Sequence, residues 1–186
     1  PRKFTKGTLG EEYTVWLQLK TIADIGIIGL PNAGKSSLLA AITNATPKIA
    51  NYKFTTINPN LGILKVFNKE YIIADIPGII KGAHKGVGLG IKFLKHIERC
   101  SSLIHLVDIT DKDICKHYDI IRTELKKYSN DVFKKKEIVI LNKIDLLDEA
   151  TIKKKLNEFK KIYKHKFYYM SVLKRTNLTN IIKALC

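Results

Sequence analysis

One stretch constrains this chain more than any other: the residues from Ile22 to Ile42, IADIGIIGLPNAGKSSLLAAI. Apolar residues over 22–28 predict a buried strand, and the spacing over 35–43 predicts a helix entered through a glycine turn. The turn, Gly29 to Ser36, fits the pattern GxxxxGK[ST]. In this pattern the glycines let successive backbone amides point inward, and the following helix adds its N-terminal dipole. The sequence therefore predicts a loop that binds a polyphosphate.

Individual residues of this loop are expected to bind different parts of the ligand. Lys35 supplies a positive charge for the outer phosphates, and the Ser36 hydroxyl is the expected magnesium ligand. The whole loop is expected to contact the nucleotide: Gly29, Leu30, Pro31, Asn32, Ala33, Gly34, Lys35 and Ser36.

Strand and helix patterns alternate along the rest of the chain. We predict strands over 61–67, 70–76, 103–109, 137–142 and 167–172, and helices over 91–99, 114–128, 151–163 and 178–185. This alternation predicts an α/β fold, in which a mostly parallel, doubly wound sheet has helices on both faces. Ligands of such sheets bind outside the carboxyl ends of the strands, and each motif of this chain follows a strand.

Three connections stand out between these elements. Asn68-Lys69 is predicted to form a hairpin turn between two short strands. Residues 43–60 have no clean period and are predicted to form a long, functional loop. Residues 77–90 hold five glycines, which suits a mobile segment better than regular structure.

A carboxylate and a glycine follow the strand predicted over 70–76. Asp75 ends the strand and Gly78 comes three residues later. Asp75 can hold magnesium through water, and the Gly78 amide can reach a γ-phosphate. Asp-x-x-Gly is also a common turn, so this pair has weight only beside the phosphate loop.

The segment LNKID, at the end of the strand predicted over 137–142, can select a base. The Asp145 carboxylate can accept hydrogen bonds from N1–H and the exocyclic amine of guanine, a donor pair that adenine lacks. The Asn142 amide can bond the N7 edge, and the Lys143 stem can lie along the base, with Ile144 between these residues. The alternative for Asp145 is the N-terminal cap of a later helix.

A last turn follows the strand predicted over 167–172. The backbone amides of Ser171, Val172 and Leu173 could meet the guanine O6. With the phosphate loop, DxxG and LNKID in this order, the sequence predicts a protein that binds guanine nucleotide with magnesium.

The charge balance offers a second partner class. The net charge is +16, which suits an anionic partner such as RNA or the ribosome. The alternative is a lysine-rich coding bias that leaves solvated ammonium groups on the protein surface. Only four of the basic residues are arginines, and arginine binds phosphates better than lysine, so the lysine excess favours this alternative. No apolar run approaches the length of a membrane span, and three widely spaced cysteines show no zinc pattern, so we expect a cytoplasmic protein away from membranes. A monomer is the default expectation for a single domain of this kind.

These motifs, together with NYKFTTINPNLGIL and DIPGIIKGAHKGVGLGIKFLKHIERC, resemble the Obg/CgtA family of P-loop GTPases over nearly the whole chain. The resemblance implies a Ras-like fold of six strands, one of them antiparallel. It implies an effector switch at Phe54, Thr55, Thr56 and Ile57, with Thr56 ligating magnesium, and a second switch from Asp75 through Ile76, Pro77 and Gly78 to about Gly90. It also implies that residues 1–20 are the remnant of a preceding domain and that 21–186 form the GTPase domain.

Hydrolysis has few dedicated residues. Ile79 stands where Ras-type enzymes have the glutamine that orients water, and His84 has no assigned task. Lys35, Thr56 and Gly78 are expected to clamp the phosphates, while Asn32 either helps to hold a potassium ion or stabilises the loop turn. We therefore expect a slow, magnesium-dependent GTPase that acts as a nucleotide switch. The resemblance implies that its target is the ribosome, chiefly the large subunit during assembly. The alternative is a basic RNA- or ribosome-binding module in which guanine nucleotide is a structural ligand.

Overall fold

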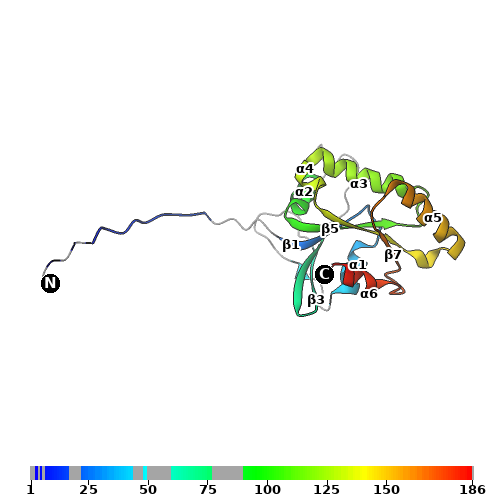
Figure 1. Cartoon of the computed structure of the whole chain (residues 1–186), viewed down its shortest axis with the longest axis horizontal. Coiled ribbons are helices and arrows are strands. Elements are labelled where there is room, and N and C mark those ends of the chain that lie inside the picture. The colour runs from blue at the N-terminus through cyan, green and yellow to red at the C-terminus, as the bar shows by residue number, and fades with distance from the viewer. Residues whose placement is uncertain are drawn as a thin grey trace.

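The computed structural model describes residues 3, 5, 7–16, 22–43, 48–49, 60–76 and 90–185. Its strands form one sheet in the order β2-β3-β4-β1-β5-β6-β7, with helices on both faces (Figure 1). The strands are β1 (Ala23–Ile28), β2 (Lys48–Ile49), β3 (Asn60–Val66), β4 (Lys69–Asp75), β5 (Cys100–Asp108), β6 (Lys136–Asn142) and β7 (Tyr168–Met170). The helices are α1 (Lys35–Ile42), α2 (Gly90–Glu98), α3 (Ile114–Tyr128), α4 (Asn130–Phe133), α5 (Glu149–Ile162) and α6 (Leu178–Leu185), with a short 3-10 helix at Ile144–Leu146.

The sheet is parallel from β4 through β1, β5 and β6 to β7, and β3 pairs antiparallel with β4. This confirms the predicted α/β sheet, with its six strands and one antiparallel member. The sheet also has a seventh strand, β2, which lies within 43–60, so the prediction of a loop throughout that segment was wrong. Two residues are too few to show an alternating pattern, and only pairing with Leu61 and Asn60 makes them a strand.

Two further boundaries differ from the prediction. The β3–β4 turn consists of Phe67 and Asn68, both at positive φ (46° and 62°), rather than Asn68-Lys69. The helix α4 was not predicted, because its four residues span barely one turn and show no period. Ser129 defines its start by accepting a hydrogen bond from the Asp131 amide.

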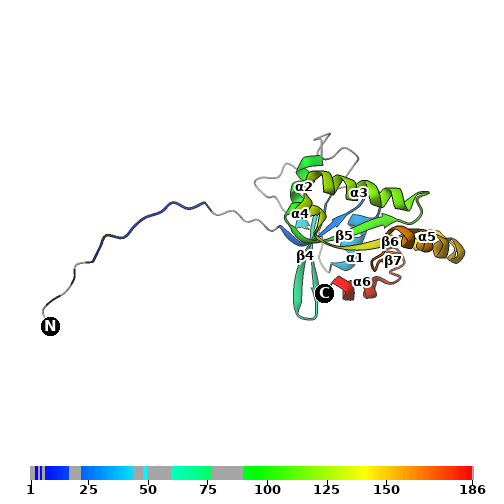
Figure 2. The same cartoon turned by 45° about the horizontal axis from the view of Figure 1, so that its top comes forward.

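The core fills both faces of the sheet, because successive side chains of each buried strand alternate in direction. On one face Ile28 packs in a cluster with Leu94 of α2 and Leu125 of α3. On the other face Ile27 packs in a cluster with α1 and α6, through Leu38 and Ile181 among others. Turning the molecule shows the helices divided between these two layers (Figure 2). The sheet is therefore a rigid platform whose strand ends can position a site.

The described part of the chain before the sheet is simple. Residues 7–16 are exposed and have no regular secondary structure (Figure 1). In the described part of the chain no helix combines the length and apolar character that a membrane span needs.

Candidate nucleotide-binding site

The loop between β1 and α1 depends on its two glycines. Gly29 has φ 154°, and a Cβ there would lie 2.4 Å from the carbonyl oxygen of Leu106. Gly34 has φ 97°, precedes α1, and leaves room for the Asn142 amide, which a Cβ would approach to 2.5 Å. Both positions therefore need glycine for conformation and for space, as the phosphate-loop pattern predicts.

The Lys35 ammonium lies across this loop. It donates a hydrogen bond to the carbonyl oxygen of Leu30 at 3.0 Å, and the residue is only 8% exposed. Burial lowers the pKa of Lys35, and the nearby Asp75 carboxylate opposes that shift. A buried ammonium whose hydrogen bond goes to a neutral carbonyl is suited to a stronger anionic partner, such as a phosphate.

Ser36 and Asp75 meet beside Lys35. The Ser36 hydroxyl donates to Asp75 Oδ2 at 2.5 Å. The other carboxylate oxygen, Oδ1, is buried and has no hydrogen-bond partner among the described residues. A hydroxyl and a carboxylate are hard oxygen donors, which Mg²⁺ prefers, and the unpartnered oxygen gives the ion or its water a place to bind. These two residues fit a magnesium site.

Asn142 joins the phosphate loop to the turn after β7. Its side-chain N–H donates to the Ala33 carbonyl oxygen at 2.9 Å, and its Oδ1 accepts from the Val172 amide at 3.2 Å. The residue is 2% exposed. Asn142 therefore holds two loops in place, in addition to the expected contact with the base.

Lys143 and Asp145 occupy the short segment after β6. Lys143 has φ 71°, and its ammonium pairs with the Asp108 carboxylate at the end of β5. Asp145 lies in the 3-10 helix and does not cap α5, because the Asp148 side chain accepts from the Thr151 amide there. The alternative of a helix cap at Asp145 was therefore wrong, and its carboxylate lies at a pocket instead.

Several of the motif residues line one pocket of about 540 Å³, although Lys35, Ser36 and Asp75 are not among its lining residues. Its walls come from the start of α1, the LNKID segment and the turn after β7. The lining residues are Gly34, Ser37, Ala40, Ala41, Asn142, Lys143, Asp145, Leu146, Val172, Leu173 and Arg175. A volume of this size suits a purine nucleoside, and Asp145 is its only carboxylate among these residues.

Several predicted residues take other places. Ile76 is buried in the core, and its amide donates to the Ile27 carbonyl oxygen at 3.2 Å. Ser171 is buried, with its amide bonded to Thr176. Asn32 is exposed and has φ 64°, a backbone conformation that asparagine tolerates, which fits a role in the loop turn.

Other predicted positions lie outside the described residues. These are Phe54, Thr55, Thr56, Ile57, Pro77, Gly78, Ile79 and His84.

Two charged residues of the site, Asp108 and Arg175, were not predicted from the sequence. Asp108 pairs with Lys143, and Arg175 lines the pocket from a backbone at φ 54°. Asp108 ends a predicted strand, as Asp75 does, so position at a strand end was a usable signal. Arg175 gives no such signal, because only the fold brings it to the pocket.

The chain is similar to GTPase Obg of Pelagibacter ubique, with 60% identity over 97% of this chain and 55% of that protein. It is similar to GTPase Obg of Rickettsia bellii, with 49% identity over 98% of this chain and 56% of that protein. The chain thus spans about half the length of these relatives.

The fold is similar to a solved structure of Era in complex with MgGDPNP and nucleotides 1506–1542 of 16S ribosomal RNA. The TM-score is 0.67 and the identity 25%, over 87% of this chain and 54% of that one. The family described as "50S ribosome-binding GTPase" matches residues 24–143, which include the phosphate loop, Asp75 and Asn142. The chain therefore belongs to the family of 50S ribosome-binding GTPases.

Proposed function

We propose that this chain binds GTP and GDP with magnesium, hydrolyses GTP slowly, and acts as a nucleotide switch in assembly of the large ribosomal subunit. One observation supports the nucleotide part of the proposal: Asp145 and Gly34 line the same pocket of about 540 Å³, and Gly34 directly precedes Lys35 in the sequence. A base in this pocket directs its phosphates toward the loop between β1 and α1.

Base selection rests on Asp145. An ionised carboxylate only accepts hydrogen bonds, and guanine offers two donors on one edge. Adenine offers an acceptor at N1, which would face the carboxylate and leave both groups unpaired. A buried polar mismatch of this kind gives strong discrimination. The exposed side chains of Leu146 and Leu173 border the same pocket, so a base covers apolar surface that water otherwise contacts.

Phosphate binding rests on Lys35 and on the loop amides. A bound phosphate replaces the Leu30 carbonyl as partner of the buried ammonium, which strengthens the interaction because the new partner is charged. Ser36 and Asp75 would hold Mg²⁺, which neutralises the outer phosphates when it is bound. Thr56 and Gly78 are proposed to complete this clamp around the γ-phosphate.

Slow hydrolysis follows from the absence of a polar side chain at Ile79, a proposal from the sequence alone. Asn32 is proposed to hold potassium, against the alternative that it serves only the loop turn. The test compares phosphate release from GTP in potassium and sodium buffers of equal ionic strength. We expect faster phosphate release in potassium. Equal rates in the two buffers would contradict the potassium role and support the alternative that Asn32 only stabilises the loop turn.

The ribosomal part of the proposal rests on the family and on charge. The family is described by 50S ribosome binding, and the net charge of +16 favours an anionic partner. We propose that the chain acts in the cytoplasm as a monomer, with residues 1–20 belonging to a preceding domain and 21–186 forming the GTPase domain.

The alternative is an RNA-binding module in which nucleotide is only structural. A co-sedimentation assay with large ribosomal subunits separates the two functions. A switch binds with different affinities in GDP and in a non-hydrolysable GTP analogue, whereas equal affinities would support the structural alternative.

A further inference from the structure

A second pocket is lined by residues of β7 and α6 and of the segments next to them. This β7–α6 pocket has a volume of about 520 Å³ and opens beside the last strand of the sheet. It is lined mainly by Lys166, Tyr168, Tyr169, Asn177, Asn180 and Lys183, and none of its lining residues carries a negative charge. None of the motifs of the nucleotide site uses these side chains.

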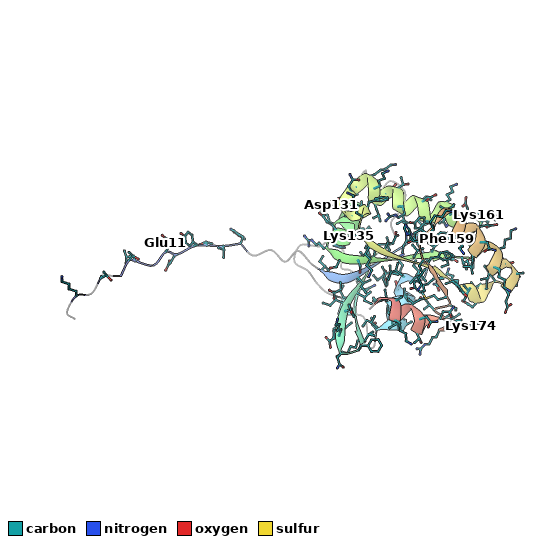
Figure 3. The ribbon with its side chains drawn as sticks, viewed as in Figure 1. Glu11, Asp131, Lys135, Phe159, Lys161 and Lys174 are labelled. Atoms are coloured by element: carbon teal, nitrogen blue, oxygen red, sulfur yellow. The ribbon has the colours of Figure 1, made fainter. Side chains whose placement is uncertain are left out.

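The part of the chain that forms this pocket is strongly basic. Residues 153–183 hold ten lysines and arginines and one acidic residue, Glu158, so they supply more than half of the net charge of +16. Lys161 and Lys174 lie on the side of the molecule where β7 ends the sheet (Figure 3). Two of the lysines of this segment, Lys166 and Lys183, line the pocket, so its walls carry positive charge, which attracts a polyanion.

The pocket also offers flat rings and amides. The Tyr169 residue is 42% exposed, and the Lys166 ammonium lies 5.1 Å from the centre of the Tyr168 ring. Asn177 donates to the Tyr169 carbonyl oxygen at 3.1 Å, which keeps its amide at the pocket. Rings stack on bases, lysines pair with phosphates and amides bond base edges, a combination that suits single-stranded nucleic acid.

A lysine-rich coding bias does not explain this distribution. A pocket on α3, bordered by Lys116 and Lys127, also contains Asp113, Asp119 and Glu124. Both pockets belong to the same lysine-rich chain, yet only the β7–α6 pocket excludes acidic residues from its walls. The α3 pocket therefore serves as an internal comparison with mixed charge.

We propose that the β7–α6 pocket binds a single-stranded RNA segment, with a base on Tyr169 and phosphates on Lys166 and Lys183. This inference rests on the proposed binding to the ribosome, because it assigns an RNA contact to a specific surface of this chain. It does not depend on GTP hydrolysis.

The test measures binding of a fluorescent single-stranded oligouridylate by anisotropy, with the whole chain saturated by GDP and magnesium. Saturation keeps the shared turn after β7 in the same state in every variant. The pocket variant is Lys166→Glu with Lys183→Glu. The control, Lys116→Glu with Lys127→Glu, changes the net charge equally on the α3 pocket.

We expect the pocket variant to bind at least about tenfold more weakly than the wild type, and the control to lose less than about threefold. The slope of log affinity against log salt should fall by about 1.4 in the pocket variant, about 0.7 for each lost phosphate contact. Tyr169→Leu should weaken binding roughly tenfold without changing this slope, because it removes a stacked base and no charge.

Equal losses in the two charge variants would overturn the proposal, since general attraction would then explain the binding. The proposal is also overturned if the wild type shows no binding to the oligouridylate. It is likewise overturned if a polyglutamate peptide binds the pocket and the RNA does not displace that peptide. GDP affinity, measured in the same samples by calorimetry, reports separately on the nucleotide site. A failure of RNA binding with intact GDP binding is thus distinct from a failure of the proposed nucleotide function.

Discussion

Single residues of the nucleotide site are constrained mainly by backbone conformation and by close approach. Gly34 combines φ 97° with a distance of 2.5 Å between a hypothetical Cβ and the Asn142 amide. The amide is in turn bonded to Ala33 and to the turn after β7. A side chain at Gly34 would therefore disturb the phosphate loop and the base pocket together.

Gly34→Ala should lower the free energy of unfolding by about 1–3 kcal/mol, because it adds backbone strain and displaces the Asn142 amide. It should also weaken GDP binding. Urea unfolding and calorimetry measure the two effects. Gly10→Ala is the control, since a Cβ there meets no atom within 4 Å, and it should stay within about 0.5 kcal/mol of the wild type. If Gly34→Ala had the unfolding free energy and the GDP affinity of the wild type, the close approach of residue 34 to the Asn142 amide would be contradicted.

Asp108 gives a pH-dependent prediction. Burial raises its pKa, but hydrogen bonds from Lys143 and Thr110 outweigh this, so the pKa lies below the ordinary aspartate value. The stabilisation is present above the unfolded-state pKa and is lost as pH falls through the lower folded-state pKa. Asp108→Asn should therefore lower the free energy of unfolding by about 1–3 kcal/mol at neutral pH and lose less stability on acidification.

Urea unfolding at neutral and at acidic pH checks this prediction. Asp119→Asn, on an exposed part of α3, is the control and should have little effect at either pH. If Asp108→Asn kept the acid dependence of the wild type, another carboxylate would have to account for it.

At the scale of elements, local patterns identified most of the fold. The helix predicted over 114–128 is present with the same bounds, because its apolar stripe and its flanking residues agree. The two-residue strand β2 and the four-residue helix α4 were missed, because each depends on pairing or capping rather than on a repeating pattern. Contacts between elements were harder still: the Asp108–Lys143 pair joins residues 35 positions apart.

The β3–β4 turn was misplaced for a related reason. Phenylalanine rarely adopts positive φ, so Phe67 gives no turn signal, yet its φ is 46°. Phe67 is 78% exposed and therefore has little packing to lose.

Phe67→Asn should raise the free energy of unfolding by about 0.5–1 kcal/mol, because asparagine accepts this conformation more readily. Thermal and urea unfolding measure the change. Asn68→Ala, the opposite change at the neighbouring position with φ 62°, should lower the stability. A loss of stability in Phe67→Asn would mean that the ring makes a contact which outweighs the strain.

At the scale of the whole molecule, the parallel sheet converts distant sequence motifs into one site. Asp108 and Met170 both pair in register with Asn142, and Ile27 pairs with Asp75, so the carboxyl ends of five strands meet at one edge. The order of motifs predicted this convergence through the general behaviour of parallel sheets. The lining by Arg175 and the second pocket beside β7 could not be predicted, because both depend on how the turn after β7 is folded.

Calorimetric titration with GDP and with ADP, in magnesium buffer, tests most directly whether this convergence selects guanine. We predict that GDP binds and that ADP binds about 10⁴-fold more weakly, because Asp145 has no donor pair to accept from adenine. Asp145→Asn should lose most of this preference, while Asp148→Asn, the cap of α5, should keep it. Equal affinities for GDP and ADP in the wild type would contradict the assignment of the pocket to a guanine base.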